Sequence, residues 1–203
     1  MLALLFAGGL FLQGVAFCQG QPIPPKHKQF EATKAKAEKG DARAQFMLGE
    51  MYLRHSDVDN VQDKTLKAQV EQDDAEAVKW FRKAAQQGLA DAQFQLGAMY
   101  DKGRGVKQDA AEAVEWFRKA AEQGFADAQL GLGAMYERGR GVKQDRVETY
   151  AWWNLAVKTR KDVAPVLRNL ERQMTPQQLT EALKRTEELK TLIQASTGSG
   201  PLL

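Results

Sequence analysis

The clearest pattern along the chain is a run of apolar and polar positions that returns in register. Residues 88–109, GLADAQFQLGAMYDKGRGVKQD, and residues 124–145, GFADAQLGLGAMYERGRGVKQD, start 36 positions apart (124 − 88) and are nearly identical. A third copy, GDARAQFMLGEMY, begins at Gly40. A fixed period in the thirties is typical of arrays of two-helix units. The pattern therefore predicts an all-α repeat protein.

The first helix of each unit has two unlike halves when its residues are placed at about 100° per position. One half is identical in the three copies; in the first copy it consists of Ala42, Ala44, Gln45, Leu48, Gly49, Met51 and Tyr52. The other half varies between the copies. A mid-helix glycine costs ~1 kcal/mol relative to alanine, so its return in register needs a packing reason. We expect the identical half to be the packing face.

The second helix of each unit has start and stop signals of its own. Asp73, Asp109 and Asp145 stand at N-cap positions, each with a glutamate three residues later, as in a capping box. Gly88 and Gly124 stand where a left-handed C-cap is favourable. The repeated GRGVKQD could be a phosphate-binding loop, but it lacks the third glycine of a dinucleotide motif and the Gly-Lys-Ser/Thr of a P-loop. We interpret it as a turn between helices.

The first unit is 12 residues longer than the others, since Gly40 and Gly88 are 48 positions apart. From Thr65 onward this insert contains no Gly or Pro, and apolar residues recur at helical spacing. We expect the second helix to begin near Asp63, in which case Asp73 is not a cap in this copy. The rival interpretation is a flexible loop as far as Gln72.

The third unit departs from the others in its second helix. A second tryptophan, Trp153, appears there, Asn154-Leu155 replaces Arg-Lys, and Arg160 stands in place of the capping glycine. An apolar gain on a solvated side predicts that another element covers it. Thr175-Pro-Gln-Gln178 provides an N-cap, a first-turn proline and a capping-box partner for a long last helix. We expect residues 161–195 to be the cap that closes a solenoid.

The two ends of the chain differ from the repeats. Residues 1–20 are charge-free and mostly apolar but too short to span a bilayer, which predicts a cleaved export signal; lipidation at Cys18 is the alternative. The Pro-rich residues 21–29 are expected to form an extended linker, and residues 196–203 a disordered tail. Between them, residues 30–195 form the predicted solenoid. Its units are expected at about 40–88, 89–124 and 125–160.

Composition excludes several classes of function. The net charge is +3, from 29 basic and 26 acidic residues spread along the chain, which argues against nucleic-acid binding. One cysteine and two histidines, with no metalloprotease or nucleophile motif, predict no metal site, no cofactor and no enzyme activity. Residues 57–63, DVDNVQD, are faintly similar to a calcium loop, but Val61 and Gln62 replace a ligand and the turn glycine. We interpret this segment as a solvated acidic loop.

The repeated unit ADAQFQLGAMYDKGRGVKQDAAEAVEWFRKAAEQG resembles the Sel-1-like repeat, a relative of the tetratricopeptide repeat. AWWNLA and MTPQQLTEA resemble the usual C-terminal ending of that family. The resemblance implies a right-handed α-solenoid that acts as a protein-binding adaptor, often exported in bacteria to the periplasm or medium. Some secreted, cysteine-rich relatives bind β-lactam antibiotics. Their paired cysteines are absent here, which argues against a β-lactam-binding hydrolase.

The favoured function is therefore an exported scaffold that binds a protein or peptide, with membrane contact only through the signal segment. An envelope module that binds glycan or peptidoglycan is the alternative. In the resembled family the first helices line the concave surface, so their varying half is the predicted partner site. Its residues are Arg43, Phe46, Met47, Glu50, Asp91, Phe94, Gln95, Asp127 and Leu130. We expect Phe46, Phe94 and Leu130 to bind the partner or to pack between helices, and Arg43 to oppose Asp91 and Asp127, which gives the groove a polarity.

Overall fold

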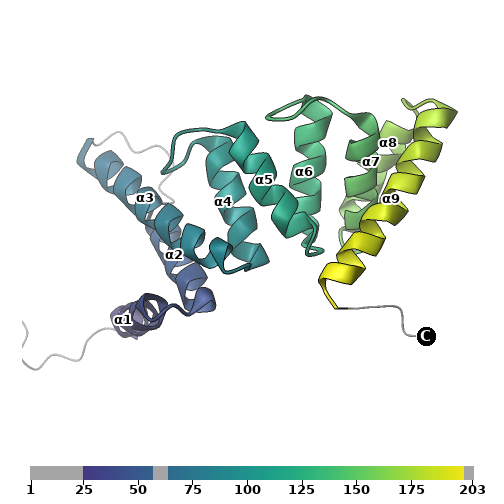
Figure 1. The fold of residues 1–203 in the computed structure, drawn as a ribbon. Helices are drawn as coiled ribbons and strands as arrows, with labels where there is room; N and C mark the ends of the chain where they lie inside the picture. The colour runs from purple at the N-terminus through teal and green to yellow at the C-terminus, as the bar shows by residue number, and fades with distance from the viewer. Residues whose placement is uncertain (1–24, 57–63, 199–203) are drawn as a thin grey trace, which may run out of the picture.

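The structure is a computed structural model that describes residues 25–56 and 64–198. Over these residues it contains only helices, joined by short turns (Figure 1). The α-helices are α1 (Pro25–Glu38), α2 (Ala42–Ser56), α3 (Lys64–Gln86), α4 (Ala90–Lys102), α5 (Ala110–Ala121), α6 (Ala126–Arg138), α7 (Arg146–Ala156), α8 (Ala164–Glu171) and α9 (Pro176–Ser196), with a 3-10 helix η1 (Lys161–Val163) before α8. None of these helices is long and apolar enough to cross a membrane.

Successive helices stack into a row that runs from α1 to α9 (Figure 1). Helices α2, α4 and α6 are the first helices of the three units, and α3, α5 and α7 are the second helices. Each first helix packs against its own second helix; α4 and α6 also pack against the second helix of the unit before them, and α2 packs against α1. This arrangement confirms the predicted helical solenoid.

The identical half of each first helix is the packing face, as predicted. Its second alanine (Ala44, Ala92, Ala128) is buried in every copy, and Leu48, Leu96 and Leu132 are fully inaccessible to solvent. The mid-helix glycines let an aromatic ring of the second helix lie against the backbone. A Cβ on Gly97 would lie 2.9 Å from Cδ1 of Phe117, and one on Gly133 would lie 2.5 Å from Cδ1 of Trp153. Each of these glycines lowers the helix propensity, but it lets an aromatic ring pack closely against the helix backbone.

A repeated glutamine joins each unit to the one before it. Its side-chain amide donates a hydrogen bond to a carbonyl in the last turn of the preceding helix. The three bonds run from Gln45 to Ala37, from Gln93 to Ala85 and from Gln129 to Ala121, at 3.0, 3.1 and 3.3 Å. The C-terminal carbonyls of a helix have no partner within that helix. The glutamine satisfies one of them at each junction, which explains why it is buried in every copy.

The GRGVKQD segments are turns between helices. Gly103 and Gly139 adopt the left-handed conformation directly after α4 and α6, with φ of 69° and 64°. The second glycine of each turn also lies against the preceding second helix. A Cβ on Gly105 would overlap the backbone of Asp74, and one on Gly141 would overlap that of Ala110. These glycines are needed for chain reversal and for close stacking.

The aspartates that end these turns cap the next helices, as predicted for two of the three copies. Asp109 accepts hydrogen bonds from the backbone amides of Ala111 and Glu112, and Asp145 caps α7 in the same way. The expected reciprocal capping box is wrong. The glutamate side chains turn instead toward the tryptophans one turn later: Trp116 Nε1 donates to Glu112 at 2.9 Å, and Trp152 Nε1 donates to Glu148 at 3.1 Å. A buried indole N–H needs an acceptor, and the glutamate supplies it.

The insert in the first unit lengthens the second helix backwards, as predicted. Helix α3 starts at Lys64 and runs for 23 residues. Asp73 is therefore a buried residue inside the helix that accepts a hydrogen bond from Gln69 at 2.9 Å, and not an N-cap. Next to it, Asp74 forms a two-pronged ion pair with Nε of Arg104, both contacts at 2.9 Å. That pair fixes the turn after α4 against α3.

The N-terminal part differs from the prediction of an extended linker over residues 21–29. Helix α1 begins at Pro25, so residues 25–29 are helical. Proline is favourable in the first turn of a helix, where its missing N–H has no partner to lose. Farther along α1, Phe30 and Ala37 pack with Leu48 and Trp80. The predicted signal of residues 1–20 and the end of the predicted tail, residues 199–203, lie outside the described residues.

The C-terminal segment covers α7, as predicted. Helix α9 begins with a capping box between Thr175 and Gln178. Leu189 of α9 belongs to the same buried cluster as Leu155 of α7. Ala182 of α9 packs in a second cluster with Trp153, together with residues of α8. The additional apolar residues of α7 therefore form the surface on which the closing cap packs.

Candidate partner-binding surface

The nine predicted site residues lie on the first helices, where four project from α2, three from α4 and two from α6. None is completely buried: Arg43 and Met47 are exposed, and the other seven are partly exposed. Because the three copies share one register, residues at equivalent positions lie on the same side of α2, α4 and α6. We call the three equivalent positions Met47, Gln95 and Gly131 the outward row.

The apolar stripe of this surface belongs largely to the packing between helices. The ring centroid of Phe46 lies 5.7 Å from that of Phe81, and Phe94 stands 5.7 Å from Phe117. Leu130 packs beside the cluster that joins α7 to the cap. All three residues therefore take part in helix packing, with these partners on second helices and on the cap and not on successive first helices. Binding by their exposed edges stays a prediction.

The charged residues of this surface pair with one another across successive helices. Arg43 Nη1 lies 3.3 Å from Asp91 Oδ2, and the amide of Gln95 donates to Glu50 at 2.8 Å. Asp127 forms an ion pair with Arg160, a residue that follows α7. Arg43 thus neutralises one of the acids that it was expected to oppose, and Arg160 neutralises the other. The predicted polarity along the groove is wrong in this form, because each acidic residue has a basic or amide neighbour within reach.

Arg160 is a residue of this surface that the sequence reasoning missed. It replaces the capping glycine of the earlier units, and its guanidinium also bonds Asp162 at 3.1 Å. Hydrogen bonding to Asp162 and the charges of Asp127 and Asp162 raise the pKa of Arg160. The loss of a glycine at a repeated position was a signal that the chain takes another path there. The identity of the partner, 33 residues away, was not readable from it.

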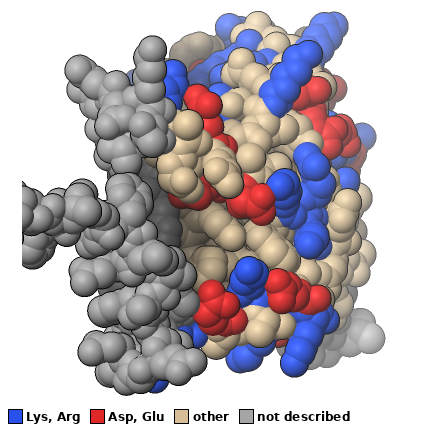
Figure 2. All heavy atoms as spheres, turned by 90° about the vertical axis from the view of Figure 1, so that its left-hand side faces the viewer, with Lys and Arg blue, Asp and Glu red and all other residues tan. Residues whose placement is uncertain are grey.

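The N-terminal end of the surface is hollowed. Met47, whose side chain is 40% exposed, lines a depression of about 330 Å³ between α1 and α2. Gln29, Thr33 and Lys36 of α1 form the opposite wall. Figure 2 shows this end of the molecule, where acidic and basic side chains are interspersed over tan surface. Sequence reasoning missed the contribution of α1 because residues 21–29 were predicted to be extended.

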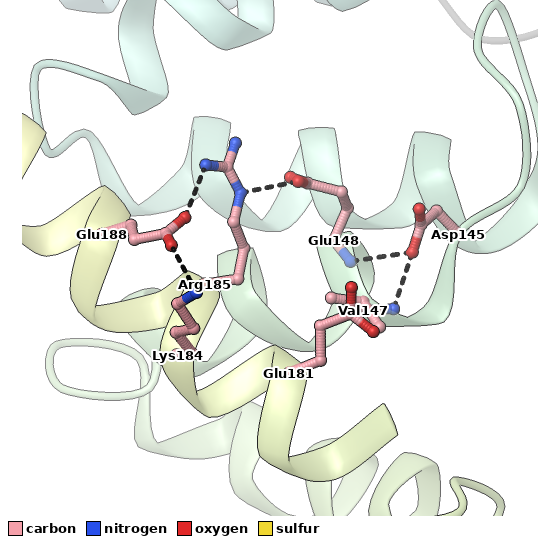
Figure 3. Close-up of a pocket in the computed structure, with 7 residues that line it drawn as sticks. All are labelled: Asp145, Val147, Glu148, Glu181, Lys184, Arg185 and Glu188. Carbon is pink, nitrogen blue, oxygen red and sulfur yellow. Dashed lines mark hydrogen bonds and ion pairs between the residues drawn. The ribbon is translucent and has the colours of Figure 1, made fainter. Parts of the chain in front are cut away.

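A second depression, of about 300 Å³, lies between the start of α7 and the middle of α9 (Figure 3). Arg185 stands at its centre, with Nε 2.7 Å from Glu148 and Nη1 3.3 Å from Glu188. Burial lowers the pKa of Arg185, but its bonds to the two glutamates outweigh burial and leave that pKa raised. The same Glu148 accepts the bond from Trp152. The charges of this depression therefore bind each other and hold α9 on α7.

Catalytic and metal chemistry has no visible centre in the part of the chain that the structure describes. Within residues 25–56 and 64–198, no group of three His, Cys, Asp or Glu side chains is placed to hold a metal ion. The side chains of His27 and His55, and residues 57–63 of the acidic loop, lie outside the described set. The most perturbed tyrosine, Tyr150, has its pKa raised to about 12 by burial and by its hydrogen bond to Glu171. That bond joins α7 to α8 and is structural.

A comparison with known protein families identifies the family of these repeats. A family model described as Sel1 repeat matches residues 42–67, 66–89, 90–125 and 126–158, which together span more than half of the chain. The chain belongs to the Sel1-repeat family. The first two matches overlap at the insert and together cover α2 and α3 of one unit. The chain is therefore a helical-repeat protein of this family.

Two solved structures are similar to this Sel1-repeat chain. One is a protective antigen present in uropathogenic Escherichia coli strains, described as displaying an SLR fold; it is 30% identical, with a TM-score of 0.59 over 85% of this chain and 42% of that protein. The other is a Sel1 repeat protein from Oxalobacter formigenes, 35% identical, with a TM-score of 0.56 over 70% of this chain and 98% of that one. The chain therefore spans less than half the length of the first. Among curated protein sequences there is no match.

Proposed function

We propose that this Sel1-repeat protein is an exported scaffold whose first helices bind an extended or helical segment of another protein. The supporting observation is the contrast between the two halves of each first helix. The packing half is identical in three copies and largely buried, whereas the other half keeps partly exposed side chains that differ from unit to unit. Selection for folding alone explains the first half. The second half is free to match a particular partner.

The outward row offers the sharpest way to test this surface, because each of its three positions accepts a long side chain without loss of a packed group. Met47 is exposed, and a lysine at position 95 can still reach Glu50. A Cβ on Gly131 would lie 3.5 Å from the Phe117 ring, which is ordinary contact distance. The triple variant Met47→Lys, Gln95→Lys, Gly131→Lys therefore blocks the surface and leaves the fold intact.

The partner is first captured with the wild-type chain from the source organism and identified by mass spectrometry, and its affinity is then measured by calorimetry. The triple variant should weaken binding at least about tenfold, as expected when long charged side chains occupy an interface centre. The matched control is Gln72→Lys, Gln86→Lys, Ala111→Lys, which adds the same charge at exposed positions of α3 and α5. Equal affinity of the triple variant and wild type would refute the assignment, provided that both show the same circular dichroism.

Arg43 and Asp91 are paired with each other, so a charge test of this surface reverses both residues at once. The exchange Arg43→Asp, Asp91→Arg restores the ion pair with opposite direction. We expect this exchange to reduce partner affinity with little change in melting temperature, because the pair is exposed. Unchanged affinity would show that the pair is purely internal.

Export is the second part of the proposal, and it is supported by the charge-free apolar start of the sequence. N-terminal sequencing of the protein recovered from periplasm and medium should begin near residue 21. Soluble cytoplasmic protein that retains Met1 would contradict export. No observation favours the glycan-binding alternative: Trp80, Trp116, Trp152 and Trp153 are all buried and offer no exposed stacking platform.

A further inference from the structure

One short stretch near the C-terminal cap has an excess of basic residues. Residues 158–172 contain five basic residues, Lys158, Arg160, Lys161, Arg168 and Arg172, and two acidic ones, Asp162 and Glu171. Their balance is 5 − 2 = +3, and residues 26–39 have the same balance. The rest of the sequence carries a net −3, since the whole chain has +3. In the structure, this stretch forms the turn after α7, the short helix η1, α8 and its C-cap.

The two acidic residues of the stretch are already engaged. Asp162 bonds Arg160, and Glu171 accepts a hydrogen bond from Tyr150 at 2.9 Å. The other four basic side chains are exposed and form no ion pair with any carboxylate in the described part of the chain. We call them the α8 basic patch; they are Lys158, Lys161, Arg168 and Arg172. Arg168 and Arg172 are four positions apart at the end of α8 and therefore lie on one side of it, while Lys158 and Lys161 lie in the turn and in η1 just before this helix.

Helix stability does not account for the whole patch. Arg168 in the last turn of α8 and Arg172 at its C-cap are favourable with the helix dipole. Lys158 directly follows the C-cap of α7, where a cation is favourable, whereas Lys161 precedes the N-terminus of α8, where the dipole disfavours a cation. Four like charges without partners also repel one another. Their free-energy cost is relieved when an anionic group binds.

The patch continues the candidate partner-binding surface. Arg160, which lies within the stretch, reaches back to Asp127 on α6. Val166 of α8, at 49% exposure, adds an exposed apolar side chain to the same short helix. We propose that the α8 basic patch binds an acidic segment of the partner protein, at the end of the surface nearest the C-terminal cap. This inference rests on the proposed scaffold function, and it gives the bound segment a direction: its carboxylates lie over α8.

A protein segment fits these dimensions better than a larger polyanion. Four cations and one exposed valine within about 20 Å match a few carboxylates and one apolar side chain of a peptide. Nucleic-acid interfaces use a wider basic face, and outside residues 26–39 and 158–172 the chain carries a net −3. The occupant is therefore a run of Asp and Glu residues with an adjoining apolar residue.

The test uses the full chain and a fluorescein-labelled decapeptide of alternating Asp and Glu, with the Asn/Gln decapeptide as its neutral counterpart. Fluorescence anisotropy at low and moderate salt gives the two affinities. We expect the acidic peptide to bind and the neutral one not to bind. The variant Lys158→Gln, Lys161→Gln, Arg168→Gln, Arg172→Gln should lose about tenfold in affinity, the sum of four exposed charge pairs.

The matched control removes the same charge from exposed lysines elsewhere: Lys28→Gln, Lys67→Gln, Lys107→Gln, Lys143→Gln. It should change the affinity less than about twofold, because these lysines lie outside the patch. Equal losses in the two variants would overturn the proposal, since they would indicate general attraction to a cationic chain. Circular dichroism and thermal melting confirm that both variants fold; all eight substituted side chains are exposed, so both should melt like wild type.

A lipid occupant is tested in parallel with phosphatidylglycerol vesicles. Patch-dependent sedimentation with vesicles, without binding of the acidic peptide, would overturn the proposal in favour of a membrane surface. The outcome is also separable from that of the proposed function. The outward-row variant should still bind the acidic decapeptide. The patch variant should still bind the partner through its other contacts, but more weakly than the wild-type protein does. Failure of the decapeptide to bind overturns the patch and leaves the outward-row test intact.

Discussion

Helices α5 and α7 occupy the same place in successive units, yet the outer face of α5 is exposed to solvent and that of α7 is buried. Glu115 and Lys119 of α5 are exposed, whereas the equivalent Ala151 and Leu155 of α7 are 0% and 8% exposed. Helix α9 makes the difference, because it lies on α7. The comparison shows that the repeat fixes where a helix stands and leaves its outer face free. In α5 that face is exposed to solvent, and in α7 the cap packs on it.

One difference between the inner faces of the two helices is the ring that packs against the facing glycine. Phe117 of α5 packs against Gly97, and Trp153 of α7 packs against Gly133 at a shorter distance. Trp153 Nε1 also donates a hydrogen bond to the backbone carbonyl of Leu130 at 3.1 Å. The larger ring therefore gains a polar contact and tolerates less change at the facing glycine.

The largest expected effect comes from exchanging the outer faces. Leu155→Lys should lower the free energy of unfolding by about 3 kcal/mol or more, because it removes a buried leucine and buries an ammonium. The reciprocal Lys119→Leu should change it by less than about 0.5 kcal/mol, as exposed substitutions do. Urea denaturation monitored by tryptophan fluorescence measures both. Equal effects of the two substitutions would contradict the claim that α9 alone distinguishes the helices.

The next effect concerns the two glycines under the rings. Gly133→Ala should destabilise the protein by about 1–3 kcal/mol, as overpacking does, and Gly97→Ala should cost less because the Phe117 ring is farther away. The gain in helix propensity is the same for both substitutions, so the difference reports packing alone. Differential scanning calorimetry gives the ranking. A more stable Gly133→Ala variant would show that the Trp153 ring moves aside without cost.

The stability of the protein should depend on pH through Tyr150, whose equivalent position in α5 is Val114. Its pKa rises from 10.0 to about 12 in the folded state, so the folded protein holds the phenol proton more tightly than the unfolded chain. The resulting stabilisation is complete below about pH 10 and is lost as the pH rises toward 12. In Tyr150→Phe, the decline of stability between pH 10 and 12 should be shallower than in wild type. Parallel declines in the two proteins would assign the effect to other groups.

The smallest effect is expected at Arg160, which replaces the Gly124 of the middle unit. Its ion pairs with Asp127 and Asp162 are solvent-exposed, and such pairs contribute little to stability. Arg160→Gln should leave the melting temperature unchanged within experimental error and lower partner affinity, since Asp127 and the end of the binding surface lose their link. A large drop in melting temperature would mean that this pair holds the cap.

Much of the fold was predictable because its signals are local or periodic. The register of the copies located the first and second helices, and glycines at turn positions marked the reversals. The absence of Gly and Pro after Thr65 predicted the long α3, and Thr175 with Gln178 predicted the start of α9. These features depend on residues a few positions apart, or on equivalence between copies, and both are visible in one sequence.

The candidate site was predicted less completely. The first-helix residues were correctly placed on one side, yet their pairing was not, since Arg43 reaches Asp91 over 48 positions and Arg160 reaches Asp127 over 33. The contribution of α1 was missed because its single copy departs from the repeat pattern. Which of two carboxylates an arginine bonds depends on the stacking offset between helices, and no local pattern encodes that offset.

By itself, the sequence determined the class of the protein: an all-α array whose period, caps and small packing residues admit one kind of stacking. Only the tertiary structure decided the roles of individual polar groups. Glu112 and Glu148 bond tryptophans and do not close capping boxes, Asp73 is buried inside a helix, and Asp74 holds Arg104 across units. The physical reason is distance. Backbone caps and helical faces are set within one or two turns, whereas a side-chain partner is chosen among all groups that stacking brings within about 3 Å.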